Sequence, residues 1–157
     1  MKVECWAMGK TQEKYLAEGI SLFDRRLRHY LPFEWVEIPD LKNAGKIPGA
    51  QVKQLEGELL LRKLKPDDHL VLLDEKGRSF PSVHFANHLD RLLQRPARRL
   101  IFHIGGAFGC SAAVQLRADE QLSLSPMTFP HQLVRLLLLE QLYRAMTILR
   151  NEPYHNE

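Results

Sequence analysis

Residues 100–106 read LIFHIGG, a short run of large apolar side chains that leads directly into two glycines. An apolar run of this length predicts a buried strand. Gly105 and Gly106 permit positive φ angles and let a ligand approach the backbone closely. A second run, HLVLLD at residues 69–74, has the same character. Both runs are predicted to be buried strands.

Short apolar runs alternate with longer amphipathic segments along the rest of the chain. The expected strands are residues 3–8, 33–38, 69–74, 100–104 and 122–125. Apolar residues at helical spacing predict a helix after each strand, and the last helix runs from about residue 129 to 150. This alternation favours an α/β fold with a mostly parallel sheet and helices on both faces. The order of the strands stays open.

Turn formers and hydroxyl side chains mark the expected ends of these elements. Residues 75–78, EKGR, predict a turn, and residues 39–50, with two prolines and two glycines, predict a loop. Ser82 and Ser111 are predicted to cap the helices that follow them. Thr128 is an N-cap candidate for the last helix, but the segment around it would also suit a rigid ligand-binding loop.

The composition excludes several classes of protein. The chain has 157 residues, of which 45% are hydrophobic and 26% charged, so it is neither disordered nor fibrous, and one domain is expected. The longest aliphatic run, residues 136–139, is too short to cross a bilayer, which takes about 20 residues. Cys5 and Cys110 cannot build a disulfide framework, which favours a reducing cytoplasm. The net charge of +3 only weakly suggests an anionic partner.

Ligands of parallel α/β sheets bind in the loops after the carboxyl ends of the strands. Three loops therefore become candidates, and they follow Leu73, Ile104 and Leu124. The glycine spacing at residues 105–109 is G-G-x-x-G, which disfavours a Rossmann-type oxidoreductase, and a Walker-type loop is excluded because no G-K-[ST] follows. On its own, the glycine turn is as consistent with a tight turn as with a ligand loop.

No metal site is expected. His84 and His88 lie four residues apart on a helix, but neither the glutamate of H-E-x-x-H nor a third ligand accompanies them. A half-buried helix face is the preferred interpretation. The arginines at 25, 26 and 28 and at 95, 98 and 99 are interpreted as solvated faces that would suit phosphate contacts in a dimer.

The last helix carries more apolar surface than one sheet requires. One stripe contains Val134, Leu138, Leu142, Ala145 and Leu149, and a second side contains Leu133, Leu137 and Ile148 together with Glu140 and Arg144. Either the helix is deeply buried in one chain, or its second side meets another subunit. The second interpretation is favoured, because a domain of this size has little core to surround the helix.

Five motifs resemble one known family. They are GKTQEKYLAEGI at 9–20, IGGAFG at 104–109, LSLSPMTFPHQLVR at 122–135, EQLYRA at 140–145 and EPYHNE at 152–157. Together they resemble the ribosomal RNA large subunit methyltransferase H group of the SPOUT class of methyltransferases. The resemblance covers essentially the whole chain, as one domain over residues 1–157.

The resemblance implies S-adenosylmethionine as methyl donor and N3 of a pseudouridine in large-subunit rRNA as acceptor. It also implies a cytoplasmic homodimer with a C-terminal trefoil knot, acting on rRNA or the ribosome without a membrane or a metal. The cofactor site that it implies consists of Leu73, Gly105, Gly106, Ser125, Pro126, Met127, Thr128, Phe129 and Pro130.

The catalytic residues expected at this site lie near the end of the chain. We expect His155 to assist proton removal and Tyr154 to stack on or position the base, both reaching across from the partner subunit. Arg144 would orient the base or its phosphate, with Glu140 one helical turn earlier to hold the guanidinium. His131 is a weaker candidate. The alternative function is a non-catalytic RNA- or nucleotide-binding module.

Overall fold

The computed structural model describes residues 1–156 of the chain. Its strands are β1 (Lys2–Met8), β2 (Phe33–Ile38), β3 (Asp68–Ser79), β4 (Arg99–Ile104) and β5 (Glu120–Ser123). Its helices are α1 (Lys14–Arg28), α2 (Gly49–Lys63), α3 (Ser82–Leu93), α4 (Ala112–Arg117) and α5 (Leu133–Leu149), with a 3-10 turn at Ala44–Lys46. These strands form one sheet in the order β2-β1-β4-β3-β5, and each neighbouring pair is parallel. The predicted parallel α/β fold is confirmed.

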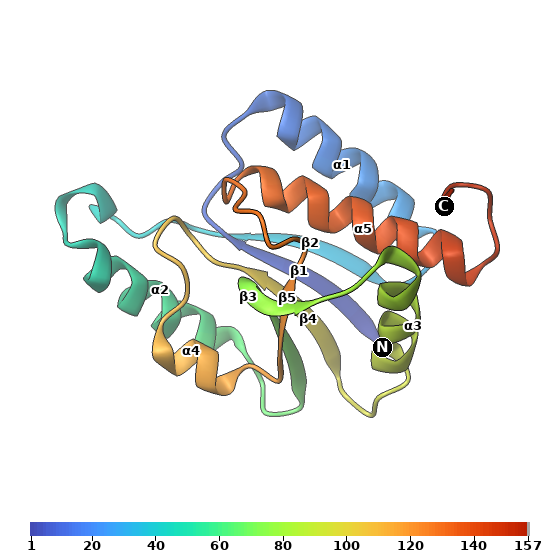
Figure 1. Ribbon diagram of the computed structural model, residues 1–157. Helices are drawn as coiled ribbons and strands as arrows, with labels where there is room; N and C mark the ends of the chain where they lie inside the picture. Colours follow the sequence, from blue (N-terminus) through green and yellow to red (C-terminus); the bar gives the residue numbers. More distant parts are fainter. Residues whose placement is uncertain (157) are drawn as a thin grey trace.

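Helices cover both faces of the sheet (Figure 1). The core on the side of α1, α3 and α5 contains Phe102 and Leu138, and the core on the side of α2 and α4 contains Ile101 and Leu60. Ile101 and Phe102 are neighbours on β4 and serve opposite cores, because successive side chains of a strand point to opposite faces. None of the helices in residues 1–156 has the length and apolar character needed to cross a membrane.

The turn predicted at residues 75–78 is wrong, because β3 continues through it to Ser79. Both Leu73 and Arg78 pair with Leu122 of β5, so the residues between them form a bulge in the ladder. Gly77 packs tightly in this bulge, where an added Cβ would lie only 2.6 Å from the carbonyl carbon of Gln121. The turn-forming residues are therefore absorbed within the strand, and β5 keeps its pairing.

The hydroxyl side chains differ in what they do at the helix ends. Ser111 caps α4 as predicted, since its Oγ accepts a hydrogen bond from the Val114 amide at 3.3 Å. The prediction for Ser82 is wrong, because its Oγ donates to Gln141 Oε1 of α5 at 3.3 Å. Thr128 is not an N-cap either, because α5 begins only at Leu133.

Arg135, near the start of α5, is fully buried at 0% exposure. Its Nη2 donates to the Met8 carbonyl at 2.6 Å, and its Nη1 donates to the Gly9 carbonyl at 2.8 Å and to Thr11 Oγ1 at 3.1 Å. A carboxylate oxygen of Glu37 lies 3.8 Å from Nη1 and supplies a counter-charge. These contacts fasten the start of α5 to the carboxyl end of β1.

This anchor determines the path of residues 124–132, here named the crossing segment. β5 lies at one edge of the sheet, and β3 and β4 separate it from β1. Neighbouring strands lie about 4.8 Å apart, so the crossing segment has to span about 14 Å over the ends of β3 and β4. Gln132 holds its far end, because Oε1 accepts from the Gln12 amide at 3.0 Å and Nε2 donates to the Lys10 carbonyl at 3.3 Å. The C-terminal trefoil knot stays a prediction.

We predict that Arg135→Met lowers the free energy of unfolding by about 3 kcal/mol or more, because the carbonyls of Met8 and Gly9 lose charged donors in a buried site. Urea denaturation followed by circular dichroism measures this change. Arg25→Met is the matched control, because Arg25 is exposed and its guanidinium donates to Ser21 on its own helix. Equal stability of the two variants would contradict the anchoring role.

Candidate functional site

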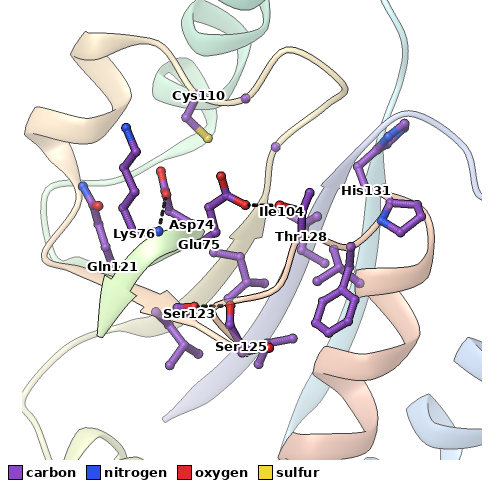
Figure 2. A pocket seen from close by; sticks show the side chains of 18 of the residues that line it. Asp74, Glu75, Lys76, Ile104, Cys110, Gln121, Ser123, Ser125, Thr128 and His131 are labelled. Carbon is purple, nitrogen blue, oxygen red and sulfur yellow. Dashed lines mark hydrogen bonds between the residues drawn. The ribbon is translucent and has the colours of Figure 1, made fainter. Parts of the chain in front are cut away.

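A cavity of about 640 Å³ lies at the carboxyl edge of the sheet. Its walls come from the end of β3, the glycine turn after β4, the end of β5 and the crossing segment (Figure 2). Its volume falls within the usual range for small-molecule sites, about 300–1,000 Å³. The three loops predicted from the strand ends therefore meet at one cavity.

Most of the residues expected at the cofactor site surround this cavity. The lining includes Leu73, Gly105, Gly106, Ser125, Met127, Thr128, Phe129 and Pro130. Pro126 does not belong to the lining, although its two neighbours in the sequence do. His131 also lines the cavity. Ligand binding by these residues stays a prediction.

One wall of the cavity is bare backbone. Gly109, at a φ of +80°, donates its amide to the Gly106 carbonyl at 3.0 Å and closes the glycine turn. An added Cβ at Gly105 would lie 3.0 Å from Cys110 Sγ, and one at Gly106 would lie 2.9 Å from both carboxylate oxygens of Glu56. Glycine at these two positions therefore lets the turn pack closely against Cys110 and Glu56.

The crossing segment forms the roof and is fixed by side-chain hydrogen bonds (Figure 2). Thr128 Oγ1 donates to Glu75 Oε2 at 2.7 Å, which joins the roof to the bulge of β3. Ser123 Oγ donates to the Ser125 carbonyl at 2.8 Å, and Ser125 Oγ accepts from the Met127 amide at 3.0 Å. The serines and Thr128 thus hold a loop in shape instead of starting a helix.

The charged groups of the cavity are mainly acidic. Among its described lining residues, Asp74 and Glu75 bring two carboxylates and Lys76 brings one cation. Burial lowers the pKa of His131, and the nearby Arg135 charge lowers it further. Burial raises the pKa of the Cys110 thiol to about 12, and the charges of Asp74 and Glu56 act in the same direction. The cavity thus favours a ligand that combines a flat apolar part with a positive charge or hydroxyl groups.

The expected catalytic residues lie elsewhere, in a group here named the tail cluster: Glu140, Arg144, Tyr154 and His155. Arg144 donates from Nε and Nη2 to Glu140 Oε1 at 3.0 and 2.6 Å, and its Nη1 lies 3.0 Å from His155 Nδ1. Tyr154 Oη donates to the same Glu140 oxygen at 3.1 Å, and the Arg144 guanidinium lies over the Tyr154 ring at 4.8 Å. Glu140 thus holds the Arg144 guanidinium as expected.

Within one chain, the tail cluster does not line the cavity. Arg144 lies eleven positions after the start of α5, which corresponds to about 16 Å along the helix axis. The cavity meets α5 at its opposite end, near Val134. The two groups therefore belong to different ends of one helix.

The comparison with protein families covers nearly the full length. A family model described as "Predicted SPOUT methyltransferase" matches residues 1–155. The chain belongs to the SPOUT methyltransferase family.

Full-length relatives narrow the family to one group. Proteins named ribosomal RNA large subunit methyltransferase H are 50% identical in Parabacteroides distasonis, with 100% of both chains covered, and 46% identical in Phocaeicola vulgatus, also over 100% of both. The relative of this name in Cytophaga hutchinsonii is 47% identical over 99% of this chain and 100% of its own. The chain belongs to this group of the SPOUT family, as its motifs suggested.

The chain is also similar to solved structures, one of which is a methyltransferase. The SpoU methyltransferase AviRb from Streptomyces viridochromogenes, in complex with AdoMet, aligns with 96% of this chain and 59% of its own, at 14% identity and a TM-score of 0.48.

The second side of α5 is only half-buried in this SPOUT chain. Leu133, Leu137 and Ile148 all keep part of their surface open, and so do Glu140 and Arg144. The residues predicted to meet another subunit are thus available for contact. The homodimer itself stays a prediction.

The expectation that all of the clustered arginines face solvent is wrong for Arg99. Arg99 donates from Nη2 to Asp68 Oδ2 at 2.6 Å, and its Nη1 lies 3.4 Å from Glu4 Oε2. That guanidinium is therefore held in an internal ion-pair network. Arg95 and Arg98 remain exposed.

The two histidines on α3, His84 and His88, lie on an exposed to half-buried face of the helix. His84 is exposed, while His88 Nε2 lies 2.7 Å from Glu120 Oε2. In the part of the chain that the structure describes, no group of three His, Cys, Asp or Glu side chains could hold a metal ion.

Sequence reasoning missed Arg135 and Glu75. A signal for Arg135 was present, because an arginine inside the apolar run from Leu133 to Leu139 needs buried partners. Nothing in the sequence pairs Glu75 with Thr128, since 53 positions separate them.

We predict that Cys110 of the folded protein resists iodoacetamide at pH 8. A pKa of about 12, against 9.0 for an ordinary thiol, leaves about a thousandfold less thiolate to react. Mass spectrometry after timed labelling measures the rate, and the same protein unfolded in urea is the control. Equal rates in the folded and unfolded protein would show that the thiol is not shielded by this cavity wall.

Proposed function

We propose that the chain transfers a methyl group from S-adenosylmethionine to N3 of a pseudouridine in large-subunit rRNA, as a cytoplasmic homodimer. The observation that carries this proposal is the cavity at the three strand ends, lined by most of the cofactor-site residues that the resemblance implies. The names of the relatives support rRNA of the large subunit as the substrate class.

The cavity suits S-adenosylmethionine in shape and charge. Gly105 and Gly106 leave room against the backbone, while Leu73 and Ile104 provide an apolar surface for a flat ring. The carboxylates of Asp74 and Glu75 complement a positively charged ligand and can accept from its hydroxyl or amino groups. When bound, the cofactor supplies a methyl group on an activated sulfonium.

The residues of the chain position the reactants and exclude water. The roof, joined to β3 through Thr128 and Glu75, covers the cavity and fixes the ligand from above. The glycine turn closes one side without flexible side chains. Because the methyl group is already activated, holding it in line with the acceptor nitrogen provides much of the acceleration.

The tail cluster supplies the side chains that bind and orient the base. The Tyr154 ring stacks on or positions the base, and Arg144, held by Glu140, orients the base or its phosphate. Both act in the cavity of the partner subunit, because the tail cluster lies away from the cavity of its own chain. Contact through the second side of α5 would bring the opposite ends of two such helices together.

His155 assists the removal of the N3 proton once its Nδ1 no longer contacts Arg144. An arginine only donates, so its contact with Nδ1 places the proton of a neutral His155 on Nε2. Acceptance of a proton at Nδ1 therefore requires that Arg144 turn away from the ring. Docking of the tail on the partner subunit and the base would provide this rearrangement, which frees Arg144 for the substrate.

We predict that labelled methyl groups from S-adenosylmethionine enter rRNA when the protein is incubated with ribosomes, free large subunits or naked rRNA. The label should map to N3 of a pseudouridine, the acceptor that the resemblance implies. Calorimetry should show binding of S-adenosylmethionine and none of NAD. Cofactor binding without transfer to any of the three substrates would favour the non-catalytic binding module instead.

We predict that deletion of residues 154–157 abolishes methyl transfer and leaves the affinity for S-adenosylmethionine within about twofold, since Tyr154 and His155 do not line the cavity of their own chain. Radiolabel transfer and calorimetry measure the two effects. Asn156→Ala is the control and should keep full transfer.

Mixing two inactive variants tests whether residues 154–157 of one subunit act in the cavity of the other. Gly105→Val crowds Cys110 and Gly109 in the glycine turn of the cavity but keeps residues 154–157. If this variant cannot bind the cofactor, a mixture with the truncated chain should regain about a quarter of the wild-type rate. A mixture that stays inactive, or a wild-type protein that sediments as a monomer at micromolar concentration, would refute the shared site.

A further inference from the structure

A second cavity, of about 370 Å³, lies between β5, α3 and the end of β3. Gln121 and Leu122 line both this cavity and the larger one, so β5 separates the two. Phe85 and Phe102 contribute apolar surface to it, and Arg78 and Arg95 contribute cations. We name it the β5–α3 cavity. None of the family motifs quoted above includes these four side chains.

One wall of the β5–α3 cavity is a stack of flat groups. The Arg78 guanidinium carbon lies 4.5 Å from the centre of the Phe80 ring, and the His88 ring stacks on Phe80 at 4.8 Å with 21° between the planes. Arg78 is exposed, so the face of its guanidinium that turns away from Phe80 is open to a ligand. A guanidinium fixed in this way provides a flat, positively charged platform.

The charge of the cavity favours an anion. Glu120 is the carboxylate among its lining residues, and it lies 2.7 Å from His88 Nε2 and 3.4 Å from His69 Nε2. Within residues 1–156, neither Arg78 nor Arg95 forms an ion pair with a carboxylate. The two arginines thus keep their charges available, while the acidic group is engaged by histidines.

We propose that the β5–α3 cavity binds a nucleotide of the rRNA strand that flanks the methylated base, and this inference rests on the proposed function. A base stacks on the open face of Arg78 and contacts the apolar surface beside it, while its phosphate is bound by Arg95. Single-stranded RNA is held in this manner by flat side chains and guanidinium planes together with cationic phosphate contacts. The shared wall of β5 places this nucleotide next to the methyl-transfer cavity.

The test uses full-length variants that separate stacking from charge. Arg78→Ala removes both the platform and its charge, Arg78→Lys keeps the charge without the flat surface, and Arg95→Ala removes the phosphate contact. Arg62→Ala is the matched control, because it removes the same charge from an exposed position on α2, which covers the opposite face of the sheet. Thermal melting and S-adenosylmethionine affinity check that each variant is folded.

Steady-state methylation of ribosomal substrate is the first measurement. We expect KM to rise about tenfold for Arg78→Ala, Arg78→Lys and Arg95→Ala, with kcat within about twofold and Arg62→Ala unchanged. Unchanged KM in the cavity variants, or an equal rise in Arg62→Ala, would overturn the proposal.

Direct binding is the second measurement and does not require catalysis. A fluorescent single-stranded oligoribonucleotide should bind the wild type more tightly than the three cavity variants, and the salt dependence should become shallower for Arg95→Ala. Binding of uridine monophosphate as tight as that of the oligonucleotide would instead assign the cavity to free nucleotides and overturn the RNA role. A wild type that binds the oligonucleotide through this cavity but transfers no methyl group would refute the proposed function alone.

Discussion

A single buried guanidinium decides where the larger cavity forms. Arg135 bonds the carbonyls of Met8 and Gly9, so α5 has to begin over the end of β1. The preceding strand, β5, lies at the far edge of the sheet. The connection between them therefore has to run over the ends of β3 and β4, where it becomes a roof. Held by Arg135 and by the bond between Thr128 and Glu75, this roof covers the glycine turn and the end of β3.

The fold was predictable wherever local pattern and tertiary structure agree. The strand at residues 33–38 has the predicted bounds, because its apolar residues and the proline after it act together. The start of α5 was predicted about four residues early, since Pro130 and Thr128 have the chemistry of a helix start. Long-range contacts of Thr128, Gln132 and Arg135 override that chemistry. The bulge of β3 was also hidden, because EKGR has turn propensity, and nothing local shows that pairing with β5 resumes at Arg78.

The sequence predicted where the site lies, but not which side chains contact one another there. Parallel strands place their ends at one edge, so the three strand-end loops had to come together, and the structure confirms that they do. The resemblance supplied residues that periodicity could not, such as Met127 and the tail. The link between Thr128 and Glu75 required knowledge of which strands are neighbours. The separation of the tail cluster from the cavity likewise depends on the length of α5 and its place over the sheet.

The contact between Arg135 and Met8 joins residues 127 positions apart. Closing so long a loop carries an entropic cost, and the contact cannot form before both of its ends have been synthesised. On the ribosome, β1 emerges long before the segment that holds its final partner. A nascent chain can form four of its strands and still have no covered cavity, because the roof and its anchor are synthesised near the end. Competence to bind a ligand is thus a property that the chain acquires only when translation is nearly complete.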